Sequence, residues 1–327
     1  MKKELVTLLR CPVSSQELVL EDGVEKDGEI FSGKLVCKNG SYTYPIHNFI
    51  PRFVAESNYA DNFGKQWNKF RLTQLDSYSR TSISADRFWK ATGLSEDFCK
   101  GKVFLDAGCG AGRFAEVVLN AGGTVIALDF SSAVDAAMLN LKHFKNFHVI
   151  QADIYKIPLK SQSFDVVYSL GVLQHTPNVE AAFRSLPKFV SRSGILCTDF
   201  YWRRIRTLMH SKYLVRPLTK RIDQIKLFSF LEKYTHFILK ISIFLSNIPL
   251  AGKFLMRLVP VANYSGVYPL SKEQLIEWAL LDTFDMLAPQ YDTPQTEKTI
   301  RKWMEEEGLE SIEVLHANLL AIRGIKK

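Results

Sequence analysis

Val103-Phe-Leu-Asp-Ala-Gly-Cys-Gly-Ala-Gly-Arg113 is the stretch that decides the fold of this chain of 327 residues. Its first three residues are apolar and favour a short buried strand. Glycines then stand at 108, 110 and 112, where the backbone can turn sharply and approach a ligand closely. The apolar residues that follow recur at helical spacing as far as Gly122-Gly123, a pair that suits the end of a helix. The stretch therefore predicts a strand, a glycine-rich cradle for a ligand, and a helix.

The charge and the glycine spacing indicate which ligand fits this cradle. A dinucleotide-binding turn follows the pattern G-x-G-x-x-G and places a pyrophosphate on the helix N-terminus. Here Arg113 stands where the last of those glycines would be, and Asp106 precedes the turn. Because a carboxylate repels a pyrophosphate and attracts a positive charge, the pattern favours a cationic ligand.

Two further acids follow predicted strands, at one βαβ period each. An apolar strand over 124–129 ends at Asp129, whose carboxylate can accept both hydroxyls of a ribose. A third strand over 148–153 ends at Asp153, and a fourth over 164–170 leads into the segment 171–177. A strand-terminal aspartate alone is often only a helix cap, but the ordered set of segments is specific.

Together these segments resemble class I S-adenosylmethionine (SAM) methyltransferases of type 11, whose cofactor carries an ammonium and a sulfonium. The resemblance implies an α/β, Rossmann-like sheet of seven strands in the order 3-2-1-4-5-7-6, and methyl transfer from S-adenosyl-L-methionine. It also implies that Asp153 faces the adenine amino group and that Ile154 offers a backbone contact. The cofactor-binding residues implied for this chain are Asp106, Ala107, Gly108, Gly110, Gly112, Arg113, Asp129, Phe130, Asp153, Ile154 and Leu170.

Methyl transfer to an oxygen or carbon acceptor usually requires a general base. His175 lies after the fourth strand, on the side of an open α/β sheet where ligands bind, but backbone hydrogen bonding explains a loop histidine equally well. The segment with Asp285 and Tyr291 resembles a part of bacterial methyltransferases that follows the cap, although helix capping and packing explain both residues nearly as well. The candidate catalytic residues are therefore His175, Asp285 and Tyr291.

Residues 1–54 are expected to form a separate small β module. Cys11 and Cys37, followed by Tyr44-Pro-Ile-His-Asn-Phe-Ile-Pro51, resemble the Trm112-like zinc-ribbon family.

The module departs from that family at the metal site. Ser14 and Gly40 stand where two of the four zinc ligands would be, and two thiolates do not complete a tetrahedral site. Since His47 is at no ligand spacing, we expect a module without metal, in which both cysteines are buried as small apolar side chains.

The rest of the chain divides into four parts. These are a helical lead-in (55–101), the SAM-binding core (102–200), a cap insertion (201–270), and helices and antiparallel strands that complete the sheet (271–327). Tyr59, Phe63 and Trp67 in the lead-in lie near helical spacing, which favours packing on the core or, as in many related methyltransferases, a lid over the cofactor. Helix caps are expected at Ser132, Ser271 and Thr293.

The insertion carries the positive charge of the chain. The formal net charge is +8, and residues 201–260 hold twelve Lys or Arg, Arg206 among them, against two acids. Glu232, Lys233 and Lys240 interrupt its long apolar run, and such charges are costly at the centre of a bilayer, so an amphipathic helix is expected instead of a membrane span. The insertion is either a cap with solvated cations or a surface for anionic membrane or a lipid-linked substrate.

Composition bounds the location of the protein and the acceptor. Contents of 46% hydrophobic and 23% charged residues are typical of a soluble globular protein, and five scattered cysteines indicate a reducing compartment. The first residues are too polar for a secretory signal, so a bacterial cytoplasmic protein is expected, with or without peripheral membrane contact. The resemblance points to a small metabolite, lipid or surface-sugar precursor as acceptor. An RNA methyltransferase and a non-catalytic SAM-binding scaffold are the alternatives, and nucleic acid is disfavoured because aliphatic residues, not exposed stacking rings, separate the cations.

Overall fold

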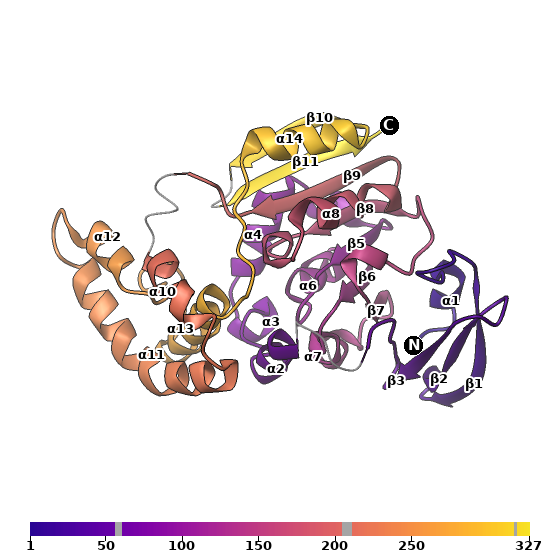
Figure 1. The fold of residues 1–327 in the computed structure, drawn as a ribbon, viewed down its shortest axis with the longest axis horizontal. Coiled ribbons are helices and arrows are strands. Elements are labelled where there is room, and N and C mark those ends of the chain that lie inside the picture. The colour runs from indigo at the N-terminus through magenta and orange to yellow at the C-terminus, as the bar shows by residue number, and fades with distance from the viewer. Residues whose placement is uncertain (56–60, 205–210, 317–318) are drawn as a thin grey trace.

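The computed structural model describes residues 1–55, 61–204, 211–316 and 319–327. A seven-stranded sheet in the order β10-β11-β9-β8-β5-β6-β7 lies at its centre (Figure 1). Counted along the chain this is the order 3-2-1-4-5-7-6, with only the C-terminal hairpin antiparallel to its neighbours, so the predicted Rossmann-like class I methyltransferase fold is confirmed. The strands are β5 (Val103–Ala107), β6 (Thr124–Asp129), β7 (Phe147–Gln151), β8 (Phe164–Ser169), β9 (Val190–Phe200), β10 (Leu309–His316) and β11 (Leu320–Lys326).

Helices cover both faces of this sheet because its central strands are apolar on both sides. One face buries a cluster formed with α4 (Ile83–Thr92), α6 (Arg113–Asn120) and α7 (Ala133–Leu141). The other face buries a cluster formed with α8 (Val179–Arg184), α14 (Glu297–Glu306) and the N-terminal module. Three single 3₁₀ turns complete the core: η1 (Ile154–Lys156), η2 (Leu173–His175) and η3 (Pro187–Phe189).

The lead-in packs on the core, with its first helix beside α7 and its third on one face of the sheet. It comprises α2 (Asp61–Lys69), α3 (Asp76–Ser79), α4 and α5 (Glu96–Cys99). Asn68 Nδ2 donates to the carbonyl oxygen of Ser132 at 2.9 Å, and α2 approaches α7 so closely that no side chain fits at Gly64. Tyr59 lies outside the described residues, as does the side chain of Phe63, so the expectation of a lid concerns Trp67 here.

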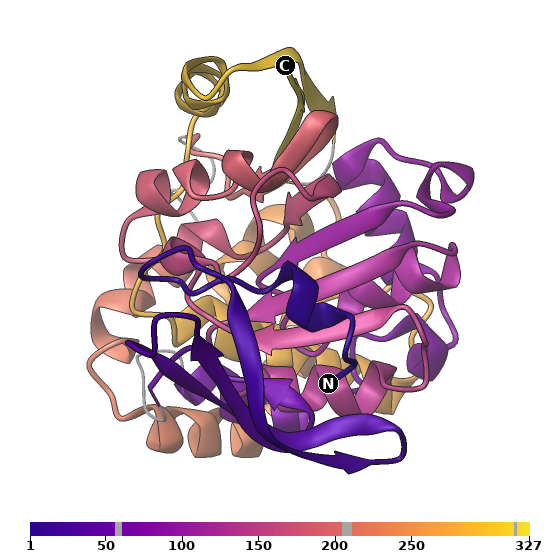
Figure 2. The ribbon, with the colours of Figure 1, turned by 90° about the vertical axis from the view of Figure 1, so that its right-hand side faces the viewer.

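The N-terminal module is a four-stranded antiparallel sheet joined to the edge of the core. Its elements are α1 (Leu5–Leu8), β1 (Leu18–Lys26), β2 (Glu29–Cys37), β3 (Thr43–His47) and β4 (Ile50–Pro51). Arg52 makes a parallel bridge with Gln151 of β7, and Leu9 makes an antiparallel bridge with Leu159. The module lies in front of the sheet in Figure 2 and shares one hydrophobic cluster with it, so it has its own sheet but not its own core.

The cap insertion is helical, as expected, and lies at the end of the molecule opposite the module (Figure 1). It comprises α10 (Ser211–Thr219), α11 (Gln224–Ser246), α12 (Gly252–Leu255) and η4 (Met256–Leu258), and α13 (Lys272–Leu287) joins it to the core. Among the described residues, no helix combines the length and the apolar character that a membrane crossing requires. Arg206 lies outside the described residues.

Two of the three expected helix caps differ in the structure. The capping box of Ser271 and Gln274 is confirmed at the start of α13. Ser132 occupies the N-cap of α7 without a side-chain hydrogen bond, and the acid of the expected capping box, Asp135, pairs with Arg52 at 2.6 Å. Thr293 does not cap α14: Thr296 accepts from the Thr299 amide, so the helix begins three residues later than the proline pattern predicted.

Candidate cofactor-binding and active site

Three aspartates lie at the carboxyl ends of three adjacent parallel strands. Asp106 is the second-to-last residue of β5, Asp129 ends β6, and Asp153 follows β7. The register of the sheet sets Asp129 beside Gln151, at the same edge as the glycine turn after β5. The three acids, which follow successive strands in the sequence, therefore lie at the same edge of the sheet. This is the edge where open α/β sheets bind ligands.

Asp106 is a buried carboxyl group without ordinary hydrogen bonds to one of its oxygens. Within the described residues, neither its Oδ2 nor the nearby Tyr168 hydroxyl has a hydrogen-bond partner of normal geometry. Burial raises the pKa of Asp106 to about 8, and the charge of Asp129 adds to this effect, whereas the nearby Tyr168 lowers it. A buried acid held in this way gains most from a cationic ligand, which would restore its ionised form.

Asp129 organises the glycine turn. Its Oδ2 accepts the Gly110 amide at 2.9 Å, and its Oδ1 accepts the Ser131 amide at 2.8 Å and the Ser131 hydroxyl at 2.7 Å. Burial raises the pKa of Asp129, and these hydrogen bonds oppose that rise. The carboxylate thus links the end of β6 to the turn after β5, and each oxygen retains acceptor capacity toward a hydroxyl.

Two apolar side chains pack closely on the glycine turn. A Cβ at Gly108 would lie 2.5 Å from Val172, and a Cβ at Gly110 would lie 3.3 Å from the ring of Trp67. Trp67 of α2 therefore lies next to the turn, which is the position that the lid alternative requires. Gly112 has another reason for its lack of a side chain, because a Cβ there would meet Leu141 of α7 at 2.5 Å.

The remaining predicted cofactor residues surround the same edge, but two of their side chains are engaged elsewhere. Arg113 donates from Nε to Ser84 and from Nη1 to Gln74, toward the lead-in. Asp153 accepts the Tyr155 amide at 2.9 Å and so caps η1. Ala107, Ile154 and Leu170 are buried, and Phe130 follows β6 half-buried.

The candidate catalytic residues meet beside this edge. His175 Nδ1 lies 3.1 Å from the carbonyl oxygen of Tyr291, and its ring packs edge-on against the ring of Tyr201 with centroids 5.5 Å apart. A carbonyl oxygen only accepts, so Nδ1 carries the proton and Nε2 is the basic nitrogen of the neutral ring. Asp285 of α13 contributes negative charge near the Tyr201 hydroxyl, whose pKa is raised mainly by burial. The structure thus brings His175 and Asp285 near Tyr201, and it brings the backbone of Tyr291 to His175.

A polar layer between the core and the cap was not predicted. Asp199 of β9 accepts the Gly171 amide and, at 3.2 Å, Arg87 of α4. Asp282 accepts from Gln74 at 2.9 Å and from the Tyr264 hydroxyl. Two signals for this layer were present in the sequence, Asp199 in the apolar run 195–200 and the segment that contains Asp285. No signal indicated the pairing, because the partners come from segments far apart along the chain.

Asp282 and Gln174 show how strongly this layer is buried. Burial raises the pKa of Asp282 to about 6, although the hydrogen bond from Tyr264 opposes the rise. The side chain of Gln174 is fully buried, and neither atom of its amide has a hydrogen-bond partner among the described residues. Buried amides are normally paired, so Gln174 is available to a polar acceptor at this place.

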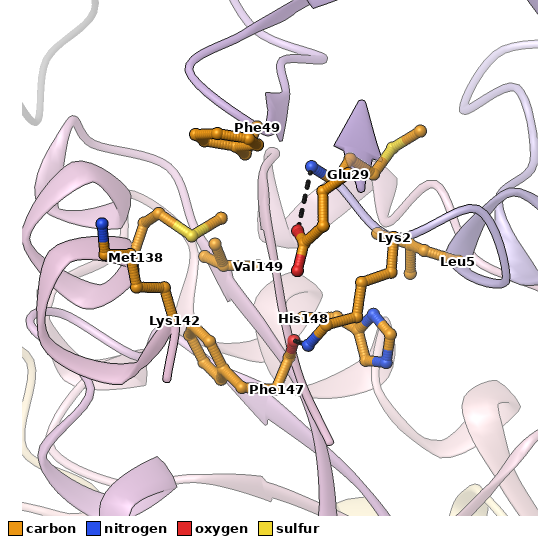
Figure 3. A pocket seen from close by; sticks show the side chains of 10 residues that line it. Lys2, Leu5, Glu29, Phe49, Met138, Lys142, Phe147, His148 and Val149 are labelled. Atoms are coloured by element: carbon orange, nitrogen blue, oxygen red, sulfur yellow. Dashed lines mark hydrogen bonds and ion pairs between the residues drawn. The ribbon is translucent and has the colours of Figure 1, made fainter. Parts of the chain in front are cut away.

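Two hollows lie away from this site, between the N-terminal module and α7. The larger measures about 620 Å³ and is bordered by Phe49, Arg52 and Asp135. In the smaller, Lys2 donates to the carbonyl oxygen of Phe147 (Figure 3), and it also donates to that of Phe144. None of the predicted site residues lines either hollow.

Both cysteines of the module lie beside Ser14. The Cys11 sulfur lies 3.3 Å from the Tyr44 hydroxyl, and the Cys37 sulfur lies 3.2 Å from the Ser14 hydroxyl. Burial raises the pKa of Cys11, but hydrogen bonds from Ser14 and Tyr44 outweigh it and lower the pKa to about 7. No group of three or more His, Cys, Asp or Glu able to hold a metal ion occurs in the described part of the chain. The zinc-ribbon relationship itself stays a prediction.

Comparison with known proteins gives a match over the core. Residues 105–198 match the family described as Methyltransferase domain. Malonyl-[acyl-carrier protein] O-methyltransferase of Enterobacter lignolyticus is 35% identical over 92 residues, which are 28% of this chain and 36% of that protein. Ubiquinone biosynthesis O-methyltransferase of Coxiella burnetii is 26% identical over 127 residues, which are 37% of this chain and 54% of that protein.

The chain thus spans about a third to a half of the length of these two relatives. Among solved structures, human N-acetylserotonin methyltransferase in complex with SAM is 12% identical with a TM-score of 0.45, covering 81% of this chain and 56% of that one. The family match runs from within β5 to within β9 and contains the glycine turn and all three acids. Residues 105–198 are therefore the part of the chain that is similar to a methyltransferase domain.

Proposed function

We propose that the chain is a class I methyltransferase that transfers the methyl group of S-adenosyl-L-methionine to a small molecule, a lipid or a surface-sugar precursor. The observation that carries this proposal is the row of Asp106, Asp129 and Asp153 along one sheet edge, around a glycine turn without room for side chains. The family match to a methyltransferase domain supports it. The names of the two relatives, which refer to malonyl-[acyl-carrier protein] and to ubiquinone biosynthesis, support the small-molecule and lipid classes over RNA.

The residues present fit this cofactor. SAM, when bound, supplies a methyl group activated by a sulfonium and therefore needs no metal to make it reactive. Asp106 would offer negative charge to the cationic part, since its carboxyl is buried beside the glycine turn. Asp129 would accept ribose hydroxyls, and Asp153 would lie near the adenine. Trp67 would cover the cofactor and exclude water, because it already packs on Gly110.

His175 is the proposed general base. With Nδ1 hydrogen-bonded to the carbonyl of Tyr291, its ring is fixed in orientation and Nε2 holds the lone pair. Tyr201 packs against its ring and Asp285 contributes negative charge near Tyr201, and both would position the acceptor. The main contribution of the protein would be to hold acceptor and methyl group aligned, an effect worth several kcal/mol.

Direct measurement of SAM binding tests the proposal. Isothermal titration calorimetry of the full chain is expected to give one SAM per chain, and Asp129→Ala is expected to weaken the affinity by at least tenfold, because both the ribose acceptor and the Gly110 anchor are lost. Asp165→Ala is the matched control. Asp165 accepts the Val103 amide near the opposite end of β5, so its loss should leave the affinity unchanged. Absence of SAM binding by the folded chain would contradict the proposal and favour a scaffold.

The acceptor class is found by methyl transfer from labelled SAM to lysate fractions separated into lipid, RNA and small-molecule pools. Label in the lipid or small-molecule pool is expected. Label that enters the RNA pool and is lost on nuclease treatment would establish the RNA alternative.

The role of His175 is tested by His175→Ala in that assay. We expect turnover to fall by about 10² to 10⁴-fold, the range for loss of a general base, while the SAM affinity stays unchanged. The pH profile of kcat should also lose its lower limb, which a purely structural role would not affect. Unchanged turnover would show that His175 only binds the backbone of Tyr291.

A further inference from the structure

The longest helix of the cap presents an apolar stripe to solvent. Phe230, Tyr234, Phe237, Ile241 and Phe244 of α11 recur at alternating spacings of four and three residues, which places them on one face. Phe230, Phe237 and Phe244 are 53%, 63% and 72% exposed. The residues that α11 buries, Leu227, Leu231, Thr235, Leu239 and Ser242, lie on another face and pack on α13 and its surroundings.

The stripe spans about 20 Å along the helix. Figure 1 shows α11 at the outer margin of the cap, at the end of the molecule opposite the N-terminal module. Further exposed apolar side chains lie on the adjoining segments, among them Leu214 and Leu218 of α10 and Phe254 of α12. A monomer that leaves this much aromatic and aliphatic surface in water is rare, since such patches normally mark a contact surface.

A row of lysines borders the stripe. Lys226, Lys233 and Lys240 follow one another at intervals of seven residues, so they lie along one edge of the apolar face. All three are exposed, and none has an ion pair in the described part of the chain. The acid of the middle of the helix, Glu232, is directed away from the row and pairs with Lys69 of α2 at 2.6 Å. The stripe is therefore flanked by positive charge alone.

This charge pattern argues against a second copy of the same helix as the partner. In a helix pair with this spacing, the positions beside the stripe usually hold complementary charges. Here one side holds the three lysines and the other holds Leu231, Ile238 and Leu245. A second copy would bring cations against cations or against apolar residues, with no acid to pair them. The negative charge must come from a different kind of surface.

We propose that α11 is the membrane-docking surface of the protein and lies in the interface of a bilayer that contains anionic lipid. The phenylalanines would enter the boundary between headgroups and acyl chains, and the lysine row would contact the lipid phosphates. The arrangement places the cap at the bilayer surface. The proposal is independent of the methyl-transfer activity and is tested without SAM.

Vesicle sedimentation tests it with the full chain. The protein is expected to sediment with vesicles of phosphatidylcholine and phosphatidylglycerol, to remain in solution with phosphatidylcholine alone, and to be released by salt. The variant Lys226→Gln/Lys233→Gln/Lys240→Gln is expected to bind about 100-fold more weakly, since each lysine near an anionic surface contributes about fivefold. The variant Phe230→Ser/Phe237→Ser/Phe244→Ser is expected to lose at least tenfold of the binding.

A matched control separates the stripe from net charge. Lys142→Gln/Lys145→Gln/Lys160→Gln removes the same charge from exposed lysines of the core and should bind anionic vesicles like the unchanged protein. The altered side chains are all exposed, so the melting temperatures should not change, which confirms that each variant is folded. The proposal would be overturned by equal loss in the control, by no sedimentation of the unchanged protein at low salt, or by a dimer in light scattering that the Phe→Ser variant abolishes.

Discussion

Asp106 is the single residue on which the proposed cofactor site depends most. Its buried carboxyl group has a pKa of about 8, so it is mostly protonated at neutral pH in the chain alone. A cation bound beside it favours the ionised form and lowers this pKa. Binding of SAM must then release a proton from Asp106 at any pH below about 8.

We therefore predict that the affinity for SAM rises with pH. Between pH 6 and 8 the dissociation constant should fall, by up to about tenfold per pH unit, because less free energy is needed to ionise Asp106 as the pH approaches its pKa. Calorimetry in buffers of different ionisation enthalpy measures both the affinity and the proton release. In Asp106→Asn the affinity should be lower and nearly independent of pH; an equally steep pH dependence in that variant would assign the proton to another group.

The sequence predicted the positions of single residues that follow adjacent strands. It did not predict contacts between residues from distant segments of the chain. Asp106, Asp129 and Asp153 follow strands at a regular period, so their placement at one edge could be predicted from topology alone. Arg87 and Asp282 meet their partners across 112 and 208 residues of sequence separation, and no local pattern indicates such contacts. The side chain of Arg113 points to the lead-in because it donates hydrogen bonds to Gln74 and Ser84 there. Neither of these two residues belonged to the sequence pattern.

Among the elements, α10 shows how misleading a count of charges can be. The interpretation of the insertion as a cap assumed that its cations are solvated. Lys212 and Arg216, however, are buried. Lys212 lies 2.8 Å and Arg216 lies 3.7 Å from the carboxylate of Asp292, which is itself almost fully buried. Burial lowers the pKa of Lys212, and Asp292 opposes this. The two cations fix the helix to the segment after α13; they do not face solvent.

Removal of Asp292 should therefore destabilise the cap. Asp292→Leu leaves two buried cations without their carboxylate and is expected to lower the free energy of unfolding by about 3 to 5 kcal/mol, measured by urea denaturation. Lys212→Met should cost less, because Arg216 still pairs with Asp292. If Lys212→Met lowers the free energy of unfolding more than Asp292→Leu does, Arg216 does not compensate for the loss of Lys212 as the partner of Asp292.

On the scale of the whole molecule, the N-terminal module and the core share one hydrophobic cluster. One hydrophobic cluster includes Leu5, Ile30 and Ile46 of the module together with Ile150 and Leu159 of the core. Arg52 adds an ion pair to Asp135 and a hydrogen bond to Gln151 at 2.7 Å. The sequence predicted a separate module for residues 1–54, because the boundary of a motif shows where a sequence pattern ends. It does not show which surfaces pack into one hydrophobic cluster.

A single unfolding transition is the expected consequence. All five tryptophans lie outside residues 1–54, so tryptophan fluorescence reports on the core and cap, while hydrogen exchange of the β2 amides reports on the module. Both probes should give the same midpoint in urea. Release of the β2 amides at a clearly lower urea concentration would show that the module unfolds by itself.

The position of α13 ties the lead-in to the cap. Gln66 of α2 donates to the carbonyl oxygen of Leu281, Thr73 donates to Glu277, and α10 is held through Arg216 to the carbonyls of Met286 and Pro289. Trp67 cannot swing off the glycine turn without disturbing the helix that also supports the cap. For an enzyme of the proposed kind, departure of the spent nucleoside and admission of the next acceptor would share one hinge.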